Sequence, residues 1–415
     1  MKFNTALLHE GVRKEEKYGA TLTPIYQNSA FYHQTAEELA KIFDNKAQGF
    51  SYTRVSNPTV EAFETRMTKL EGGVASVACA SGMAAITNAL LNILQAGDEV
   101  VSTASLYGGT IDLFHDIEAF GIRTRFVENN NWDEIREAIG EHTKVIYAET
   151  IGNPKLDVTD IQTLAQIAHE HKIPLIVDNT VATALLVKPI ELGADIVVNS
   201  TSKYINGSGN SISGVLTDAG KMKWDVEKFP GLAPYKKFGP FAYTAKLRYG
   251  LFRNTGACLA PMNAYLNQLG LETLGLRMER ECENAYQLAV WLRDNFKQQG
   301  VSVNYPGLES SPWHEIAKKQ CHGYFGAILT IRVGSRERAF QVIDALNLAY
   351  KLPNIGDTRT LVVHPQSTIS LHNTKEQQED AGVYEDTIRI CVGIEDIEDL
   401  KADFQQALRL SGELA

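Results

Sequence analysis

The segment from Ala194 to Gly209 places a lysine where it could do chemistry. Residues 195–199 form a short run rich in isoleucine and valine, which predicts a buried strand with a polar end. Lys203 follows that end directly after Ser202. A buried lysine loses its proton readily and attacks carbonyl carbons, so it could hold an aldehyde cofactor as a Schiff base. The alternative is a solvated lysine in a serine- and glycine-rich loop, because lysine after a strand is common.

Asp178 closes an almost fully apolar run at residues 174–177. A lone buried carboxylate costs several kcal/mol, so it must pair with a cation or raise its pKa. The cationic ring nitrogen of a cofactor would satisfy it. Helix capping by Asp178 or Asn179 is the alternative, because aspartate caps helices readily.

Ser81, Gly82 and Met83 form a turn of mostly small residues between a predicted strand at 74–80 and a predicted helix at 84–94. Such a turn presents free backbone N–H groups and the positive end of the helix dipole, which suits a phosphate. Many strand-to-helix turns have this composition and bind nothing. The turn alone therefore does not decide whether this site binds a phosphate.

The elements that must position these residues alternate between strand and helix. Alternation of this kind implies right-handed crossovers and a parallel sheet, whose ligands bind at the carboxyl ends of the strands. Further predicted strands cover residues 99–104, 143–149 and 173–178, with a helix at 160–171. The residues expected at strand ends are Ser81, Tyr107, Asn153, Asp178 and Lys203.

Residues 1–56 show little regular pattern and are expected to form an N-terminal arm. The arm ends just ahead of a predicted helix, which Asn57 caps, Pro58 opens and Gly72-Gly73 stops. Tyr52 and Arg54 lie immediately before that cap. On spacing alone they could be ordinary surface residues.

The pattern changes near residue 260, which predicts one domain at 57–260 and a C-terminal domain at 261–415. A long helical stretch at 257–296, with a break expected at Gly270 and Gly275, precedes strands at 327–333 and 387–392 and a helix at 336–350. Arg389 lies within the last strand. A buried arginine needs an anion, either a ligand carboxylate or the partner of a structural salt bridge.

Composition excludes several classes of function. The chain has 415 residues, a formal net charge of −10 and a pI of about 5.6, so nucleic acid and anionic membrane surfaces are not expected partners. Its five cysteines are scattered without a Cys-x-x-Cys pair, which predicts neither disulfides nor a metal site. No run has the length of a signal peptide core or a membrane helix, so we expect a cytoplasmic protein.

One ligand would use all these features. Pyridoxal phosphate offers an aldehyde to Lys203, a ring to Tyr107 and a ring nitrogen to Asp178, and its phosphate would meet the Ser81 turn. The chain also resembles the Cys/Met-metabolism pyridoxal-phosphate enzymes of fold type I over almost its whole length. The resemblance rests on YGATLTPIYQNSAF (18–31), YTRVSNPT (52–59), LEGG (70–73), ASGMAA (80–85), LYGGT (106–110), ETIGNP (149–154), VDNT (177–180), the lysine segment, TLVVHPQST (360–368) and IRICVGIED (388–396).

This resemblance implies an α/β fold with a mostly parallel central sheet and a smaller α/β C-terminal domain. It also implies a role for each candidate residue. Lys203 would bind the cofactor aldehyde and move protons, Asp178 would pair with the ring nitrogen, and Tyr107 would stack on the ring. The phosphate would lie against Ser81, Gly82, Met83, Ser200 and Ser202, with Tyr52 and Arg54 reaching it from a neighbouring subunit of an obligate homodimer, usually paired into a homotetramer. Asn153, Thr360 and Arg389 would hold the substrate carboxylate.

The lysine segment departs from the family pattern. Ser202 stands where threonine is usual, and Gly207-Ser208 stands where Gly-His is usual. Ser202 retains a hydroxyl, so phosphate binding is still expected. The missing histidine puts loop packing and substrate access in doubt.

Within the family, the chain resembles the O-acetylhomoserine sulfhydrylase branch most. Gly109 stands where methionine γ-lyases carry cysteine, and the 360–368 and 378–383 segments look like those of sulfhydrylases. The implied reaction is γ-replacement: sulfide or a thiol replaces the acetate of O-acetylhomoserine and gives homocysteine. Methionine γ-lyase, cystathionine γ-synthase and cystathionine γ-lyase activities are alternatives. A catalytically inactive binding protein with the same fold is a further one.

Overall fold

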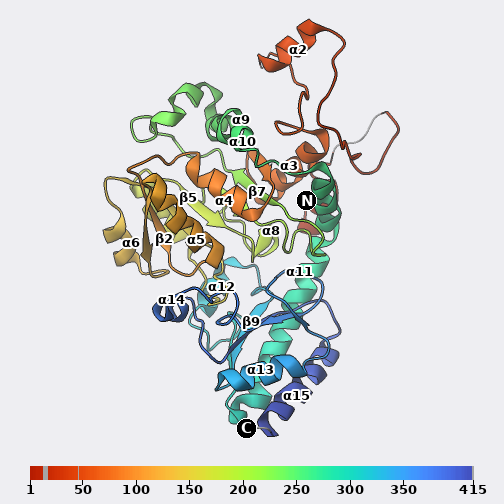
Figure 1. Ribbon diagram of the computed structural model, residues 1–415, viewed down its shortest axis with the longest axis vertical. Coiled ribbons are helices and arrows are strands. Elements are labelled where there is room, and N and C mark those ends of the chain that lie inside the picture. Colours follow the sequence, from red (N-terminus) through yellow and green to blue (C-terminus); the bar gives the residue numbers. More distant parts are fainter. Residues whose placement is uncertain (13–16, 45, 414–415) are drawn as a thin grey trace.

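A mostly parallel sheet forms the centre of the molecule, as predicted (Figure 1). The computed structural model describes residues 1–12, 17–44 and 46–413. Within them, the larger sheet has the strand order β1-β7-β6-β5-β4-β2-β3. Strands β2 to β6 pair in parallel, whereas β7 runs antiparallel to both β6 and β1. The strands are β1 (Ala75–Cys79), β2 (Glu99–Thr103), β3 (Arg123–Val127), β4 (Thr143–Glu149), β5 (Leu175–Asp178), β6 (Ile196–Asn199) and β7 (Gly214–Asp218).

Helices cover both faces of this sheet because successive strand residues point to opposite sides. In β6, Val197 packs into one apolar core, while Ile196 and Val198 pack into the other. The first core includes side chains of α3 (Pro58–Glu71), α6 (Trp132–Ala138), α7 (Ile161–Glu170) and α8 (Thr183–Leu186). The second includes α4 (Gly82–Leu91), α5 (Gly108–Asp116) and η1 (Ile117–Phe120).

The α3 helix forms where its boundary residues predict. The Asn57 side chain accepts a hydrogen bond from the Thr59 N–H, Pro58 occupies the first turn, and Gly72 ends the helix in the left-handed region at φ 77°. The α4 helix begins at Gly82, two residues earlier than the sequence suggested, so Gly82 and Met83 belong to its first turn.

The C-terminal part is built on a second, mostly antiparallel sheet of order β10-β11-β12-β9-β8. Its core includes residues of α13 (Arg336–Ala345), α15 (Ile397–Glu413) and the second half of α11 (Pro261–Phe296). The α13 helix is shorter than predicted, because the chain turns extended at Leu346. The remaining elements here are β8 (Ser302–Asn304), β9 (Ile328–Arg332), β10 (Tyr350–Lys351), β11 (Leu361–Val363), β12 (Thr387–Cys391), η3 (Lys297–Gln299), α12 (His314–Gln320) and α14 (Lys375–Asp380).

The expected break of α11 at Gly270 and Gly275 is wrong, because the helix runs unbroken through both residues. The glycines instead allow close packing. A β-carbon on Gly270 would lie 2.3 Å from the Ile205 carbonyl oxygen, and one on Gly275 would strike the Asn4 side chain. The first half of α11 joins the core of the larger sheet and the second half joins that of the smaller sheet. The domain boundary at 260 therefore stays a prediction, and it coincides with the start of a helix shared by both cores.

The N-terminal arm has two different parts. Helix α1 (Phe3–His9) packs on α3 and α11 and buries Ala6 and Leu7. Helix α2 (Ala36–Phe43) buries no residue and lies apart from the body (Figure 1). None of the helices in the described part of the chain is both long and apolar enough to cross a membrane.

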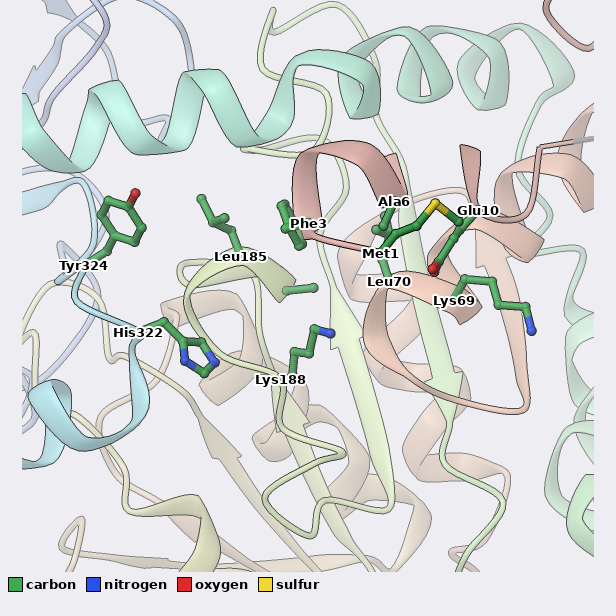
Figure 2. A pocket seen from close by; sticks show the side chains of 11 residues that line it. Met1, Phe3, Ala6, Glu10, Lys69, Leu70, Leu185, Lys188, His322 and Tyr324 are labelled. Carbon is green, nitrogen blue, oxygen red and sulfur yellow. The ribbon is translucent and has the colours of Figure 1, made fainter. Parts of the chain in front are cut away.

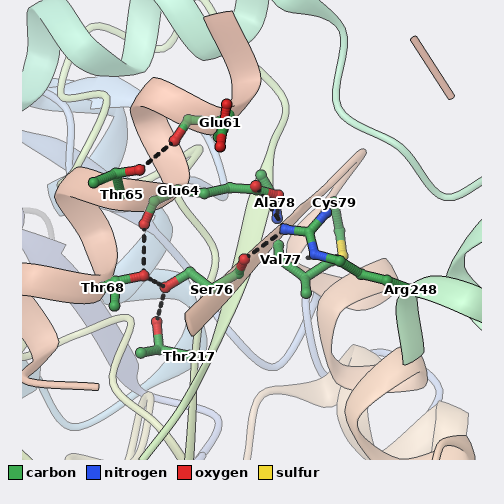
Figure 3. Close-up of polar contacts among 10 residues, drawn as sticks. All are labelled: Glu61, Glu64, Thr65, Thr68, Ser76, Val77, Ala78, Cys79, Thr217 and Arg248. Carbon is green, nitrogen blue, oxygen red and sulfur yellow. Dashed lines mark hydrogen bonds and ion pairs between the residues drawn. The ribbon is translucent and has the colours of Figure 1, made fainter. Parts of the chain in front are cut away.

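A buried polar network joins α3 to β1 and to α9 (Ala242–Tyr249) (Figure 3). In the chain, α9 follows η2 (Pro230–Phe241) and precedes α10 (Leu251–Thr255). The Glu64 carboxylate accepts hydrogen bonds from the Ala78 N–H at 2.8 Å and from Arg248 Nη2 at 2.6 Å. Arg248 Nη2 also donates to the Ser76 carbonyl at 2.8 Å. Burial raises the pKa of Glu64 and the Arg248 charge opposes this rise. The network fixes β1, the strand that leads into the Ser81 turn.

Candidate active site

The predicted site residues follow the carboxyl ends of neighbouring strands, as a parallel sheet requires. Asn153 follows β4, Asp178 ends β5, and Lys203 follows β6. The Ser81 turn follows β1, and Tyr107 follows β2. These ends meet at one edge of the sheet, so segments far apart in the sequence come together there.

The turn at Ser81 is built for a close approach. The Ser81 hydroxyl caps α4 by accepting from the Ala84 N–H at 3.0 Å, which leaves the earlier N–H groups of Gly82 and Met83 for an anion. A β-carbon on Gly82 would lie 2.6 Å from the Ser200 β-carbon. The helix start and the loop after β6 therefore form one cradle of backbone donors and a serine hydroxyl, which fits a phosphate.

Ser202 has less freedom than the sequence suggested. Its hydroxyl donates to the Ser213 carbonyl at 3.0 Å and accepts from the Ser213 N–H at 2.8 Å. The single hydroxyl proton is therefore engaged within the loop. Phosphate binding by Ser202 stays a prediction and requires this pair to rearrange.

Asp178 is buried and accepts a hydrogen bond from the Thr180 N–H at 2.8 Å. The Tyr147 hydroxyl approaches its other oxygen at 3.5 Å. Among the residues that the structure describes, no lysine, arginine or histidine forms an ion pair with Asp178. Burial raises its pKa, as expected for a carboxylate that lacks a cation. A protonated ring nitrogen would supply that cation.

Lys203 lies half-buried, and its Nζ donates to the side-chain oxygen of Asn354. Burial, followed by the nearby charge of Arg389, lowers the pKa of Lys203. A lowered pKa leaves more of the amine unprotonated and able to react with an aldehyde.

Arg389 and Lys203 both contact Asn354, so they lie near each other. Arg389 Nη2 donates to the Asn354 carbonyl at 3.0 Å, and its Nη1 donates to Asn153 Oδ1 at 3.3 Å. Arg389 is 2% exposed, and its Nε has no partner in the described part of the protein. A guanidinium with an unused buried N–H fits a carboxylate. The sequence does not identify Asn354 as a site residue, because a single asparagine in a loop forms no recognisable motif.

Thr360 lies against Glu395 instead of facing Arg389 directly. Its hydroxyl donates to Glu395 Oε2 at 2.9 Å and accepts from the Gly393 N–H at 3.0 Å. The role of Thr360 in substrate binding stays a prediction, and a direct contact with substrate would require Glu395 to release the hydroxyl.

Tyr107 precedes α5, and the residue is 48% exposed. Its N–H donates to Glu149 Oε1 at 2.6 Å. A β-carbon on Gly109 would lie 2.7 Å from Cε1 of the Tyr107 ring. Glycine at position 109 therefore permits the ring position. No sequence pattern predicts the contact with Glu149.

Tyr52 and Arg54 are both exposed and contact each other rather than Lys203. The Arg54 guanidinium lies 5.4 Å from the centre of the Tyr52 ring, and its Nη1 donates to the Arg253 carbonyl at 2.5 Å. Their predicted reach into a neighbouring subunit stays a prediction.

Glu71 contacts two asparagines that lie next to candidate site residues. This fully buried carboxylate accepts from Asn199 Nδ2 at 2.8 Å and from Asn179 Nδ2 at 3.4 Å. Each asparagine is next in sequence to a candidate residue, Ser200 or Asp178. Burial raises the pKa of Glu71 to about 7, and both amides oppose the rise. The end of α3 thus ties the ends of β5 and β6 together.

A cavity of about 330 Å³ lies near the end of α3, apart from the candidate site (Figure 2). Its wall includes Phe3, Leu70, Leu185, Lys188 and Tyr324. None of the predicted site residues lines it.

Comparisons with known proteins identify the family of this chain. The model of the family described as Cys/Met metabolism PLP-dependent enzyme matches residues 4–409. An O-acetyl-L-homoserine sulfhydrylase of Corynebacterium glutamicum is 43% identical, covering 97% of this chain and 96% of the relative. O-acetyl-L-homoserine sulfhydrylase 1 of Thermus thermophilus is 39% identical, covering 98% of this chain and 100% of the relative.

Two solved structures are similar to this chain over almost its whole length. A Campylobacter jejuni protein described as an O-acetylhomoserine (thiol)-lyase, solved with N'-pyridoxyl-lysine-5'-monophosphate, has a TM-score of 0.94 and 32% identity, covering 99% of this chain and 100% of its own. A cystathionine gamma-lyase from Lactobacillus plantarum, complexed with L-serine, has a TM-score of 0.86 and 30% identity, covering 99% of each chain.

Proposed function

The chain belongs to the Cys/Met metabolism PLP-dependent enzyme family, and we propose that it catalyses γ-replacement on O-acetyl-L-homoserine. Sulfide or a thiol forms the new bond to the γ-carbon, and acetate leaves, so that sulfide yields L-homocysteine. One observation carries the proposal: Lys203 and Arg389 meet at Asn354, which brings a reactive amine next to a receptor for an amino-acid carboxylate.

Pyridoxal phosphate is the cofactor of this family, and when bound it serves as an electron sink for the substrate α-carbon. The donor set fits it. Lys203 would hold the aldehyde carbon, Asp178 would supply the negative partner of the ring nitrogen, and Tyr107 would cover the ring. The backbone and hydroxyl groups of Ser81, Gly82, Met83 and Ser200 would hold the phosphate, and Ser202 would join them once its hydrogen bonds with Ser213 rearrange.

The remaining steps use this chain's own residues. Arg389 and Asn153 would bind and orient the substrate carboxylate, and Thr360 would assist them. Lys203, once the substrate amine has taken its place, would remove the α-proton and, after giving that proton up, a β-proton. After sulfide has bonded to the γ-carbon, it would return protons to the β- and α-carbons, so the amine carries one extra proton at a time. Its lowered pKa suits this role as a base, and Asn354 gives the free amine a fixed position.

The active unit is proposed to be a homodimer, paired into a homotetramer, in which Tyr52 and Arg54 contact the phosphate bound by the neighbouring subunit. The arm supports this proposal. Helix α2 buries no residue, and Tyr32 and Phe43 beside or within it are largely exposed, as expected of a segment that packs on a second copy. The cytoplasmic location stays a prediction.

Elimination is the second candidate reaction, because the chain also resembles a cystathionine gamma-lyase structure. The test is a competition assay on purified protein loaded with pyridoxal phosphate. We expect homocysteine to exceed 2-oxobutanoate when O-acetylhomoserine is supplied with saturating sulfide. Dominant 2-oxobutanoate, or efficient cleavage of methionine, would establish a lyase instead.

The control is the Lys203→Ala variant, which should give neither product. Borohydride reduction of the wild-type protein should fix the cofactor on the peptide that contains Lys203. Fixation on another lysine would refute the assignment. A protein that remains colourless with added cofactor would indicate a non-catalytic binding protein.

A further inference from the structure

Glu149 is a buried carboxylate next to the candidate site that the proposed mechanism does not use. It ends β4 and pairs in register with Asp178, which ends β5. Its side chain is almost fully buried, and Oε1 accepts the Tyr107 N–H at 2.6 Å. Glu149 therefore connects the residue that covers the cofactor ring with the residue that faces the ring nitrogen.

The two carboxylates have unequal environments. Asp178 faces two donors, the Thr180 N–H at 2.8 Å and the Tyr147 hydroxyl at 3.5 Å, whereas within the described residues the Glu149 carboxylate accepts a hydrogen bond from the Tyr107 N–H alone. In the described residues neither forms an ion pair with a lysine, arginine or histidine. Two adjacent buried carboxylates resist joint ionisation, and the one with fewer donors keeps its proton.

The pKa values follow this geometry. Burial, and next the charge of Asp178, raise the pKa of Glu149 well above its usual range. The pKa of Asp178 is also raised by burial, but Thr180 and Tyr147 pull it down. A proton shared by the pair therefore belongs on Glu149.

We propose that Glu149 is a positioning residue that acts as an uncharged carboxylic acid. It fixes the Tyr107 backbone at the start of α5, and it leaves Asp178 as the one ionised carboxylate for the cofactor. The inference rests on the proposed function only for the identity of the cofactor. It does not depend on which substrate is used or on the balance between transfer and elimination.

The test compares Glu149→Gln, which keeps an oxygen acceptor without charge, with Glu149→Ala, which removes it. Thr159→Val is the matched control, because the Thr159 hydroxyl donates to the Glu149 backbone carbonyl at 2.7 Å and does not contact the carboxylate. Cofactor-free proteins are titrated with pyridoxal phosphate, and the absorbance band of the bound cofactor is followed against pH. No substrate is present, so failure here and failure of the homocysteine assay are separate results.

We expect Glu149→Gln to bind pyridoxal phosphate within about twofold of wild type with an unchanged pH profile, and Glu149→Ala to bind about tenfold more weakly. Equal losses in both variants would overturn the uncharged state, and no loss in Glu149→Ala would overturn the anchoring role. If Glu149→Ala does not fold, hydrogen exchange of the Tyr107 amide decides. Slow exchange in wild type and Glu149→Gln supports the inference, and fast exchange in wild type overturns it.

Discussion

Gly82 and Ser200 approach so closely that a β-carbon on Gly82 would lie 2.6 Å from the Ser200 β-carbon and 2.8 Å from its hydroxyl oxygen. Gly82 follows β1 and Ser200 follows β6, and β7 lies between these strands in the sheet. The contact therefore spans the sheet edge and brings the N-terminus of α4 against the loop that carries Lys203. Only a residue without a side chain permits it.

Gly82→Ala should weaken cofactor binding, because the new methyl group must push the Ser200 loop away. We expect at least about a tenfold rise in the dissociation constant for pyridoxal phosphate and a loss of about 1–3 kcal/mol in the free energy of unfolding. Cofactor titration and urea unfolding measure these changes. Gly140→Ala is the control, because its β-carbon would meet nothing closer than 3.9 Å. Unchanged affinity in Gly82→Ala would refute the cradle.

Gly109→Cys should displace the Tyr107 ring, since the β-carbon at position 109 would lie 2.7 Å from Cε1. We expect a shifted cofactor absorbance band and a larger share of 2-oxobutanoate relative to homocysteine, because the displaced ring admits water to the site. Gly108→Ala is the comparison, since its β-carbon meets only the Ile369 carbonyl, at 3.3 Å. An unaltered product ratio in Gly109→Cys would show that glycine there serves the turn alone.

Asp178→Asn should keep the fold and slow removal of the substrate α-proton by about tenfold or more, because a neutral amide no longer favours a charged ring nitrogen. Exchange of the α-proton with deuterated solvent measures this step directly. Tyr147→Phe removes only the hydroxyl 3.5 Å from Asp178 and should have a smaller effect. Wild-type exchange in Asp178→Asn would count against the pairing.

Arg54→Ala should loosen cofactor binding if the arm reaches the neighbouring subunit. Mixing it with Lys203→Ala should then restore activity after subunits exchange, because a mixed dimer holds one complete site. Random exchange predicts roughly a quarter of the wild-type activity. Exchange is verified by mass spectrometry of differently tagged subunits. Verified exchange without restored activity would place Arg54 in its own subunit's site or outside any site.

Glu71→Gln should change how stability depends on pH. Burial raises the pKa of Glu71 in the folded protein from 4.5 to about 7. Below pH 4.5 both the folded and unfolded states hold the proton. Between there and about pH 7 only the unfolded state loses it, so wild type loses stability as pH rises through this window.

Relative to wild type, the Glu71→Gln variant should therefore gain stability between pH 5 and pH 8, by on the order of 2–3 kcal/mol. Urea unfolding at both values measures the difference. Glu137→Gln, at an exposed position on α6, is the control and should show no such gain. A difference between wild type and Glu71→Gln that is constant with pH would mean that Glu71 is already ionised when buried.

Much of this protein is determined by local sequence. Asn57, Pro58 and Gly72 set the bounds of α3, because caps and left-handed residues act over a few positions. Apolar runs ending at Asp178 and before Lys203 identified two strand ends, since a buried strand needs such a run. The family motifs, in order along the chain, identified the cofactor and the branch of the family.

Only the tertiary structure decided which side chains meet. The sequence did not predict β7, a short strand that contains Asp218 and inserts between β1 and β6, because strand order depends on contacts distant in the chain. No local sequence pattern predicts that Glu149 contacts Tyr107. The same is true of Asn354, which contacts both Lys203 and Arg389. Gly270 taken alone predicts a break in the helix, yet the helix continues through it. The missing side chain instead allows the Ile205 carbonyl to approach closely. Partner identity, burial and the resulting pKa shifts exist only once the chain is folded.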